Sequence, residues 1–302
     1  MSIVLRLGRR LQRGYSMLGK LLYVHGVLST KSMTLPDFLG IGAQKSGTTW
    51  LYENLRQHPD LYLTREKEIE YFDHHFHRSL NFYSEKFRAG TGKLKGEISP
   101  SYGYLHKSRI KFIRAILPDV KLIFLMRNPV ERIWSHAFMS LVKHTGRALD
   151  EVPDAEFYAY FKRSWVVRAS NYPAMLDNWL SVFPREQMYL GLYDEIKNSP
   201  QKLLCEIFAH LGVTTSVDWN DFPYKDVIIP PAGPDYAHHD QGRGVRVFGH
   251  KTTDSFMPQR HRNLLMGMYR NDIEILNQRF GLPTLSWLTE SDQDPARLVS
   301  RG

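Results

Sequence analysis

Cysteine is almost absent from this 302-residue sequence, in which Cys205 stands alone. A single cysteine excludes an internal disulfide framework and a structural zinc site built from several thiolates. A chain of this length buries roughly 75% of the surface that its unfolded form exposes, so it needs neither kind of staple. Length alone is compatible with one large domain or two small ones.

Acidic residues and long apolar runs are both missing from the first 36 residues. The basic residues there are Arg6, Arg9, Arg10, Arg13, Lys20 and Lys31. The longest stretch without Lys or Arg is residues 21–30, which is short of the roughly 20 apolar residues of a spanning helix. We therefore expect no transmembrane anchor, and a cleaved signal peptide fits poorly because arginines interrupt the apolar region.

Two interpretations remain for this segment, which we set apart as residues 1–34. It is either a basic amphipathic helix packed on the domain, or a membrane-surface or mitochondrial-type transit segment, since both of these are basic and lack acids. The whole sequence is also basic, with 40 Lys and Arg against 31 Asp and Glu and hence a net charge of +9. That balance favours an anionic partner without identifying it.

From residue 35 onward the hydrophobic pattern alternates between strands and helices. Strands are expected at residues 37–43, 94–99, 121–126 and 187–193. Helices are expected at 48–58, 108–117, 130–142, 172–183, 199–211 and 261–280. This order predicts one α/β domain over 35–290, with a parallel central sheet flanked by helices, of the P-loop nucleotide-binding type. Residues 226–254 are expected to form a long loop, and 291–302 a tail.

Polar motifs follow two of the expected strands, where ligands bind in open α/β sheets. After the first strand comes GAQKSGTTW (42–50), a glycine-rich turn entering a helix, which can hold phosphate or sulfate through backbone N–H groups. It is not a Walker A loop, because Thr48 rather than Lys follows Gly47. The alternative is a plain helix cap by Thr48 with an incidental Lys45.

The motif RNPVERIWS (127–135) follows the strand at 121–126. Arg127 can bind a phosphate through two nitrogens, and Ser135 can donate a hydroxyl hydrogen bond from two turns into the next helix. Pro129 suits the first turn of that helix. The alternative is a structural ion pair between Arg127 and Glu131.

Together these motifs resemble the sulfotransferases that use 3′-phosphoadenosine 5′-phosphosulfate (PAPS). KSGTTWL (45–51) is similar to the family's 5′-phosphosulfate loop, and RNPVERIWS to its 3′-phosphate segment. LYDEIKNSPQKLLCEIFAHLG (192–212) resembles a segment of the cytosolic branch. EIEYFD (68–73) resembles a stretch of the heparan sulfate N- and 3-O-sulfotransferases. The resemblance covers roughly residues 37–288.

The resemblance implies a role for each matching residue. Lys45 would stabilise the bridging oxygen as the sulfuryl group leaves, and Glu68 would be the general base. The 5′-phosphate would be held by Ser46, Gly47, Thr48 and Thr49, the adenine by Trp50 and Tyr193, and the 3′-phosphate by Arg127 and Ser135. The family's reaction needs no metal, and its nucleotide product is adenosine 3′,5′-bisphosphate (PAP).

Several positions depart from the family pattern. Ile98 stands where the glycan-modifying branch often has a lysine, so a second catalytic cation is absent or supplied from elsewhere. The cytosolic branch uses a histidine base, for which the candidates here are His106, His136 and His144. Glu68 also has a plain alternative, as an exposed acid in the charged run 65–68. The late basic residues Arg243, Arg246 and Lys251 are candidates to cover the donor, and His74, His75 and His77 are interpreted as surface histidines rather than metal ligands.

The acceptor is not determined by these motifs. A glycan, a glycolipid or a small molecule fits, with a hydroxyl or amine as the attacking group. The single cysteine and the lack of an anchor favour the cytoplasm, with peripheral membrane contact through residues 1–30. A P-loop kinase-like phosphoryl transferase stays open as an alternative, as does a basic nucleic-acid-binding module. We expect no nucleic-acid partner, because no such motif occurs.

Overall fold

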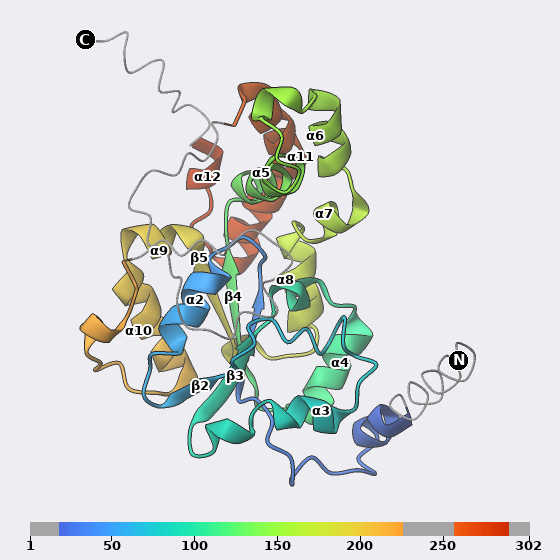
Figure 1. Cartoon of the computed structure of the whole chain (residues 1–302), viewed down its shortest axis with the longest axis vertical. Coiled ribbons are helices and arrows are strands. Elements are labelled where there is room, and N and C mark those ends of the chain that lie inside the picture. The colour runs from blue at the N-terminus through green and yellow to red at the C-terminus, as the bar shows by residue number, and fades with distance from the viewer. Residues whose placement is uncertain (1–17, 226–256, 290–302) are drawn as a thin grey trace.

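The computed structural model describes residues 18–225 and 257–289 (Figure 1). A five-stranded, all-parallel sheet forms the centre of this part of the chain, in the order β2-β3-β1-β4-β5. The strands are β1 (Phe38–Gly42), β2 (Leu61–Leu63), β3 (Leu94–Ile98), β4 (Lys121–Met126) and β5 (Met188–Leu192). The predicted α/β fold with a parallel sheet is confirmed.

Helices cover both faces of the sheet. They are α2 (Thr48–Leu55), α3 (Leu80–Glu85), α4 (Lys107–Ile116), α5 (Pro129–Phe138), α6 (Asp154–Phe161), α7 (Ser164–Arg168), α8 (Tyr172–Leu180), α9 (Tyr193–Asn198), α10 (Pro200–Leu211), α11 (Gln259–Phe280) and α12 (Ser286–Thr289). A π-helical turn, Met139–Lys143, continues α5. A shorter helical segment at residues 18–24 precedes the sheet. None of the helices in the described ranges has the length and apolar character that a membrane span requires.

The strands are buried on both sides, and their side chains divide between two cores. In β4, Leu122 and Phe124 join the larger core, which also contains side chains of α4, α5, α8 and α11. Ile123 and Leu125 point the other way, into the core shared with α2 and α10. This alternation explains why β4 is a continuous apolar run in the sequence.

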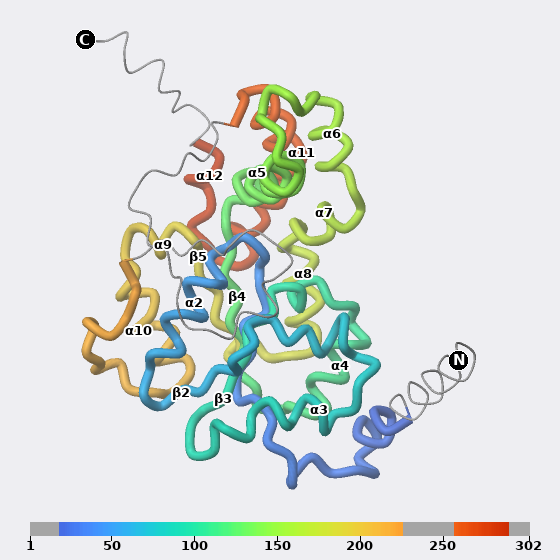
Figure 2. Tube along the Cα trace, in the orientation of Figure 1, coloured from blue at the N-terminus to red at the C-terminus, as the bar shows by residue number. Residues whose placement is uncertain are grey.

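Segments far apart in sequence meet above the sheet. The tube in Figure 2 shows α11 beside α5 and α8, and both contacts are close. Arg262 of α11 pairs with Glu131 of α5 at 2.8 Å. The alternative interpretation, an ion pair between Arg127 and Glu131, is therefore wrong. This leaves the Arg127 guanidinium available for another partner.

Some predicted elements need correction. The strand β2 was missed because three residues directly after a turn carry too little pattern. The helix expected over 48–58 ends at Leu55, and the one expected over 172–183 ends at Leu180. The helix expected to reach 142 changes to π-type hydrogen bonding after Phe138. The predicted loop at 226–254, the tail 291–302 and the first half of the segment 1–34 lie outside the described residues. The predicted domain limits stay predictions.

Candidate active site

The predicted site residues follow the carboxyl ends of four strands. After β1 the chain forms β2 and β3 on one side of β1, and then crosses to form β4 and β5 on the other side. The connections therefore change direction between β1 and β4, and open α/β sheets bind ligands at such a point. Lys45 follows β1, Arg127 follows β4 and Tyr193 follows β5. Glu68 joins them because its backbone N–H donates to the carbonyl of Ile98, the last residue of β3, at 3.1 Å.

The loop from Ala43 to Gly47 is shaped to hold an anion. Gly47 has a φ of 82°, and a Cβ there would lie 2.3 Å from the Ile196 Cδ1 of α9, so both the backbone and the packing favour glycine. Gly47 is also the residue that caps α2, which corrects the alternative that Thr48 does so. Since glycine has no side chain, no side-chain oxygen occupies the first N–H groups of the helix. Those groups, together with the helix dipole, favour a phosphate or sulfate group.

Ser46 supports the same conclusion. Its side chain is fully buried, and its hydroxyl has no hydrogen-bond partner among the described residues. Buried polar groups nearly always have partners, so an orphaned hydroxyl in an anion-shaped loop fits a ligand oxygen. Thr48 is also buried, and Thr49 is half-buried.

Lys45 is mostly buried and surrounded by positive charge. Its ammonium donates to the thioether sulfur of Met139 at 2.7 Å, a weak acceptor. Burial, together with Lys143 and Arg127, lowers the pKa of Lys45 to about 8, while Glu68 acts in the opposite direction. A buried ammonium without a close carboxylate gains most from a bound anion, so the residues here fit the sulfated donor.

Glu68 is a partly exposed carboxylate near this cluster of cations. It pairs with Lys67, and 31% of its side chain is exposed, so a substrate can reach it. Its φ of 65° is unusual for a residue other than glycine. Its backbone is bonded to the end of β3, the neighbour of β1, so Glu68 lies at the same edge of the sheet as Lys45, and its charge acts on Lys45.

Arg127 and Tyr193 are in direct contact. The guanidinium lies 4.6 Å from the centre of the Tyr193 ring, and the Lys197 ammonium lies 5.2 Å from the same ring. Ser135 is half-buried on α5. Arg127 is thus held by stacking rather than by an ion pair among the described residues, which leaves its N–H groups able to bind a phosphate.

Trp50 lies away from open solvent. Its side chain is 2% exposed in the core between α2 and α10, and the indole N–H donates to the carbonyl of Tyr224 at 3.1 Å. Its expected contact with adenine stays a prediction, as does that of Tyr193.

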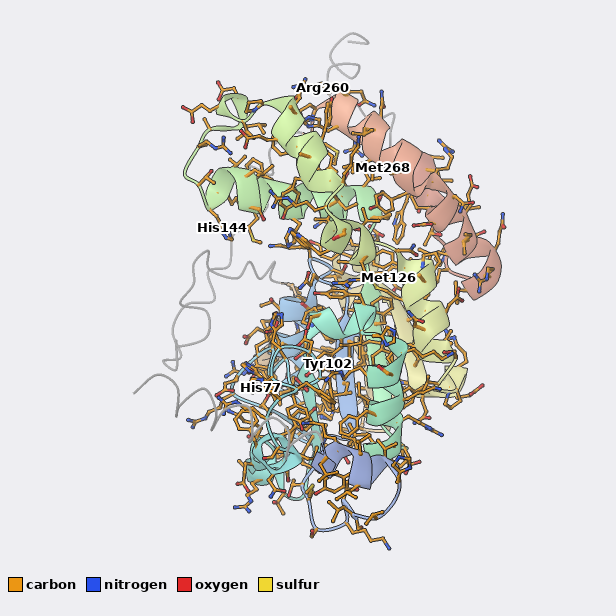
Figure 3. All side chains as sticks on the ribbon, turned by 90° about the vertical axis from the view of Figure 1, so that its right-hand side faces the viewer. His77, Tyr102, Met126, His144, Arg260 and Met268 are labelled. Carbon is orange, nitrogen blue, oxygen red and sulfur yellow. The ribbon has the colours of Figure 1, made fainter. Side chains whose placement is uncertain are left out.

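The three histidine candidates occupy different surroundings. His106 caps the N-terminus of α4 through its ring nitrogen. Burial, with Arg132 and Lys45, lowers the pKa of His136 to about 3, so its ring is neutral at ordinary pH and a poor proton acceptor. His144 is exposed, and Figure 3 labels it at the edge of the molecule, as it does His77.

Two features of the site escaped the sequence analysis. Lys143 lies on the π-helical turn close enough to lower the pKa of Lys45. Its sequence signal was weak, since it lies 16 residues after Arg127 without a motif of its own. The second feature is the buried carboxyl of Glu97 in β3, whose hydrogen bonds lead to the segment that carries Glu68.

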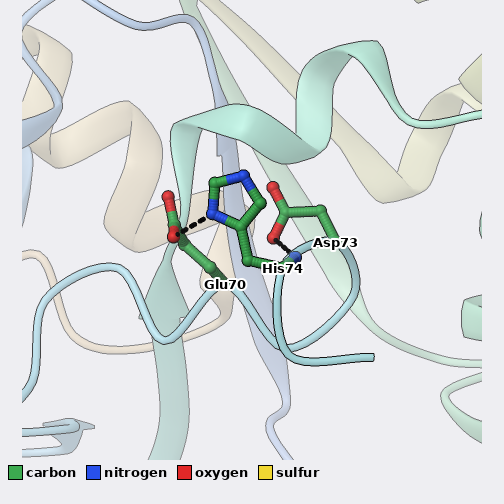
Figure 4. A group of neighbouring side chains, drawn as sticks. All are labelled: Glu70, Asp73 and His74. Atoms are coloured by element: carbon green, nitrogen blue, oxygen red, sulfur yellow. Dashed lines mark hydrogen bonds and ion pairs between the residues drawn. The ribbon is translucent and has the colours of Figure 1, made fainter. Parts of the chain in front are cut away.

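A further group of polar side chains follows Glu68 (Figure 4). The ring Nδ1 of His74 lies 2.7 Å from a carboxylate oxygen of Glu70, and the His74 backbone N–H donates to Asp73 at 2.5 Å. Burial raises the pKa of Glu70, and the bond to Glu70 raises the pKa of His74. His74 and His77 are exposed and His75 is half-buried, so they lie mainly at the surface. The late basic candidates Arg243, Arg246 and Lys251 lie outside the described residues.

Comparison with known proteins identifies the family of the chain. A family model described as "Sulfotransferase domain" matches residues 35–223. Human heparan sulfate glucosamine 3-O-sulfotransferase 6 is 34% identical over 198 residues, which cover 63% of this chain and 56% of that protein. The membrane-associated sulfotransferase kil1 of Dictyostelium discoideum is 24% identical over 285 residues, 66% of this chain and 60% of that protein.

The fold is also similar to that of a solved sulfotransferase structure. A sulfotransferase crystal structure from Alicyclobacillus acidocaldarius matches with a TM-score of 0.61 at 22% identity, over 83% of this chain and 98% of that one. The chain spans less than two thirds of the two curated relatives named above. The family match includes the loop after β1, Glu68, Arg127, Ser135 and Tyr193. This chain belongs to the sulfotransferase domain family, whose sulfuryl donor is PAPS.

Proposed function

We propose that this chain transfers a sulfuryl group from PAPS to a hydroxyl or amine of a carbohydrate acceptor. What supports the proposal is the placement of Lys45 and Glu68 at one edge of the sheet. Lys45 is a buried cation in the loop after β1, and Glu68 is a reachable carboxylate whose backbone is bonded to the end of the adjacent strand β3. A cation and a base on one site are what transfer to a neutral nucleophile needs.

The donor would be held at both of its charged ends. Ser46, Gly47 and the first N–H groups of α2 would bind the 5′-phosphosulfate, with Thr48 and Thr49 beside them. Arg127 and Ser135 would bind the 3′-phosphate. The donor supplies an activated sulfuryl group on a phosphate leaving group. The stacking of Arg127 on Tyr193 supports this assignment, because it orients the guanidinium without neutralising it.

Glu68 and Lys45 would divide the chemistry. The acceptor oxygen or nitrogen forms a bond to sulfur while the bond from sulfur to the bridging phosphate oxygen breaks. Glu68 takes the proton that the acceptor loses. Lys45 neutralises the negative charge that appears on the departing oxygen. Burial and the neighbouring cations lower the pKa of Lys45, which makes its ammonium a stronger hydrogen-bond donor to that oxygen.

Lys143 would supply the second cation that Ile98 cannot. Ile98 is 1% exposed in the core of the sheet. Lys143 is an exposed residue of the π-helical turn that follows α5, and its charge acts on Lys45. Cations placed around a transferring group stabilise charge that develops there.

The acceptor class rests on two supports. The stretch 68–73 resembles that of glycan-modifying enzymes, and one of the similar proteins is named as acting on heparan sulfate glucosamine. We also propose peripheral membrane contact through residues 1–30, in line with their basic composition and with the name of the Dictyostelium relative. A cytoplasmic location stays a prediction.

Calorimetry with PAP tests the donor site first. Binding near micromolar is expected, about −8 kcal/mol, without magnesium. It should weaken in Lys45→Ala and in Arg127→Ala and stay unchanged in Lys111→Ala, which removes an exposed lysine of α4. Binding of ATP with magnesium but not of PAP would favour the kinase alternative. Salt-sensitive binding of RNA or DNA without PAP binding would favour the nucleic-acid module.

Transfer from radiolabelled PAPS to N-desulfated heparan sulfate then tests the acceptor and the base. Glu68→Gln should lower kcat about 10²- to 10⁴-fold while leaving PAP binding intact. Glu66→Gln is the matched control, because that carboxylate is exposed and pairs with Lys86 instead. Equal activity of the two variants would remove Glu68 as the base. Transfer to small phenols but not to the polysaccharide would overturn the carbohydrate assignment.

A further inference from the structure

The start of the described chain carries an apolar surface that faces solvent. Large apolar side chains here are exposed by 40% to 68%, namely those of Leu18, Leu21, Val24, Val27 and Leu28. Elsewhere in the described residues, large exposed apolar side chains are scattered, as at Trp165, Val167 and Leu285. Clustered exposure of this kind marks an interaction site, whereas single exposed apolar residues are ordinary. We call residues 18–28 the apolar strip.

The helical part of this strip turns its lysine toward the protein and its exposed leucines, Leu18 and Leu21, toward solvent. Lys20, which an ordinary surface helix would turn toward water, is 3% exposed. Its ammonium donates to the carbonyls of Phe76 at 2.6 Å and Arg78 at 2.7 Å, and lies 4.4 Å from the centre of the Phe76 ring. The cation therefore fixes the helix to the body of the protein. As a result, the leucines point outward.

The sequence that flanks the strip indicates what covers it. The first 36 residues contain no Asp or Glu and six Lys and Arg, of which only Lys20 lies within the strip and is buried. A second copy of the chain would bring a second basic flanking sequence to the same contact, which is unfavourable. The surface of an anionic bilayer offers both an apolar layer for Leu and Val and negative headgroups for the basic residues.

We propose that the apolar strip inserts into the interface of an anionic membrane and docks the enzyme there. This inference deepens the proposed membrane contact and rests on it, but it is independent of the sulfuryl-transfer chemistry. Lys20 determines the geometry of docking, because it binds the strip to residues 76–78. Those residues lie in the same connection between β2 and β3 as Glu68, and Figure 1 shows the helical segment beside α3 and α4. Docking would thus hold this side of the active site in a constant position relative to the membrane.

The test is sedimentation of the full-length protein with vesicles of phosphatidylcholine alone or with phosphatidylglycerol. Binding is expected to the anionic vesicles, to fall as salt is raised, and to drop at least tenfold in the double variant Leu21→Ser, Val24→Ser. Leu285→Ser is the matched control, because it removes an equally exposed leucine far along the chain and should bind like the wild type.

Other outcomes would overturn the proposal. These are no binding to either vesicle, binding that the double variant leaves unchanged, or a dimer in sedimentation velocity that the double variant dissociates, since the strip would then be a contact between copies. Calorimetry with PAP keeps the two proposals apart. The double variant should bind PAP as the wild type does, which also verifies that it folds.

Discussion

The buried carboxyl of Glu97 offers the sharpest test of how the active site is held. It is fully buried in β3 and accepts hydrogen bonds from Tyr83 at 2.5 Å, Ser99 at 2.7 Å and Tyr102 at 2.9 Å. Two of these hydroxyls accept in turn from the segment after Glu68. Ser99 accepts from the backbone N–H of Glu70 at 3.0 Å, and Tyr102 from that of Phe72 at 3.3 Å. One carboxyl thereby anchors the segment between β2 and β3 that carries the proposed base.

The perturbation is Glu97→Gln, which keeps the shape of the side chain and removes its charge. Burial, only partly offset by the three hydrogen bonds, raises the pKa of Glu97 from 4.5 to about 7. Between these values the folded protein binds a proton that the unfolded chain does not, so the free energy of unfolding falls as pH rises. A difference of that size corresponds to about 3 kcal/mol in all. The Gln variant lacks this dependence.

Urea unfolding of both proteins at several pH values between about 4.5 and 8 measures the effect. The stability of the variant relative to the wild type should increase by about 3 kcal/mol across this window. His136, whose pKa is about 3, changes stability in the opposite direction, but it does so in both proteins and cancels in the comparison. Glu206→Gln, which removes the tyrosine–carboxylate bond to Tyr189, is the control for loss of such a bond. A difference that stays flat from pH 4.5 to 8 would refute the reasoning.

Three further predictions concern the donor loop and the base. Gly47→Ala should abolish PAP binding and destabilise the fold by about 1–3 kcal/mol, because its Cβ would meet Ile196. Adding Ile196→Ala should restore part of the PAP binding, measured by calorimetry, and part of the stability, measured by thermal melts. No restoration would mean that the φ of 82° alone causes both losses. Lys45→Met should lower kcat about 10²- to 10³-fold. The same change should make the ligand-free protein more stable at pH 7 by up to about 3 kcal/mol. The reason is that the pKa of Lys45 in the folded protein is about 8, below the ordinary 10.5, so the charge on the buried amine opposes folding at pH 7 and this cost disappears as pH rises from 8 to 10.5. A less stable Lys45→Met protein would contradict that sign. His136→Asn should keep the shape of the pH profile of kcat/KM, because a ring with a pKa of about 3 does not titrate near neutrality; loss of the acidic limb would make His136 the base.

The sequence was sufficient where one short segment carries the whole signal. The run 121–126 is apolar at every position after Lys121, and only a strand buried on both faces requires that, so β4 was predicted at its observed limits. The loop 42–50 was recognisable because glycine, lysine and hydroxyl residues at fixed spacing bind an anion through local backbone geometry. Segments with little local signal were missed, such as the three residues of β2 and the helix α9, whose six residues follow β5 without a break.

Tertiary structure decided everything that depends on residues distant in sequence. Helix α11 brings Arg262 from far along the chain to pair with Glu131. Arg127 therefore stacks on Tyr193 and does not pair with Glu131. The neutrality of His136 and the low pKa of Lys45 come from burial and from neighbouring cations, which a sequence does not display. Lys20 looked like one more basic residue, yet its burial turns the leucines outward. Local backbone preference is encoded residue by residue, so the sequence determined the four longer strands and the anion loop. Burial and charge depend on what packing brings together, so only the folded chain determined how the site is charged and which surface is left apolar.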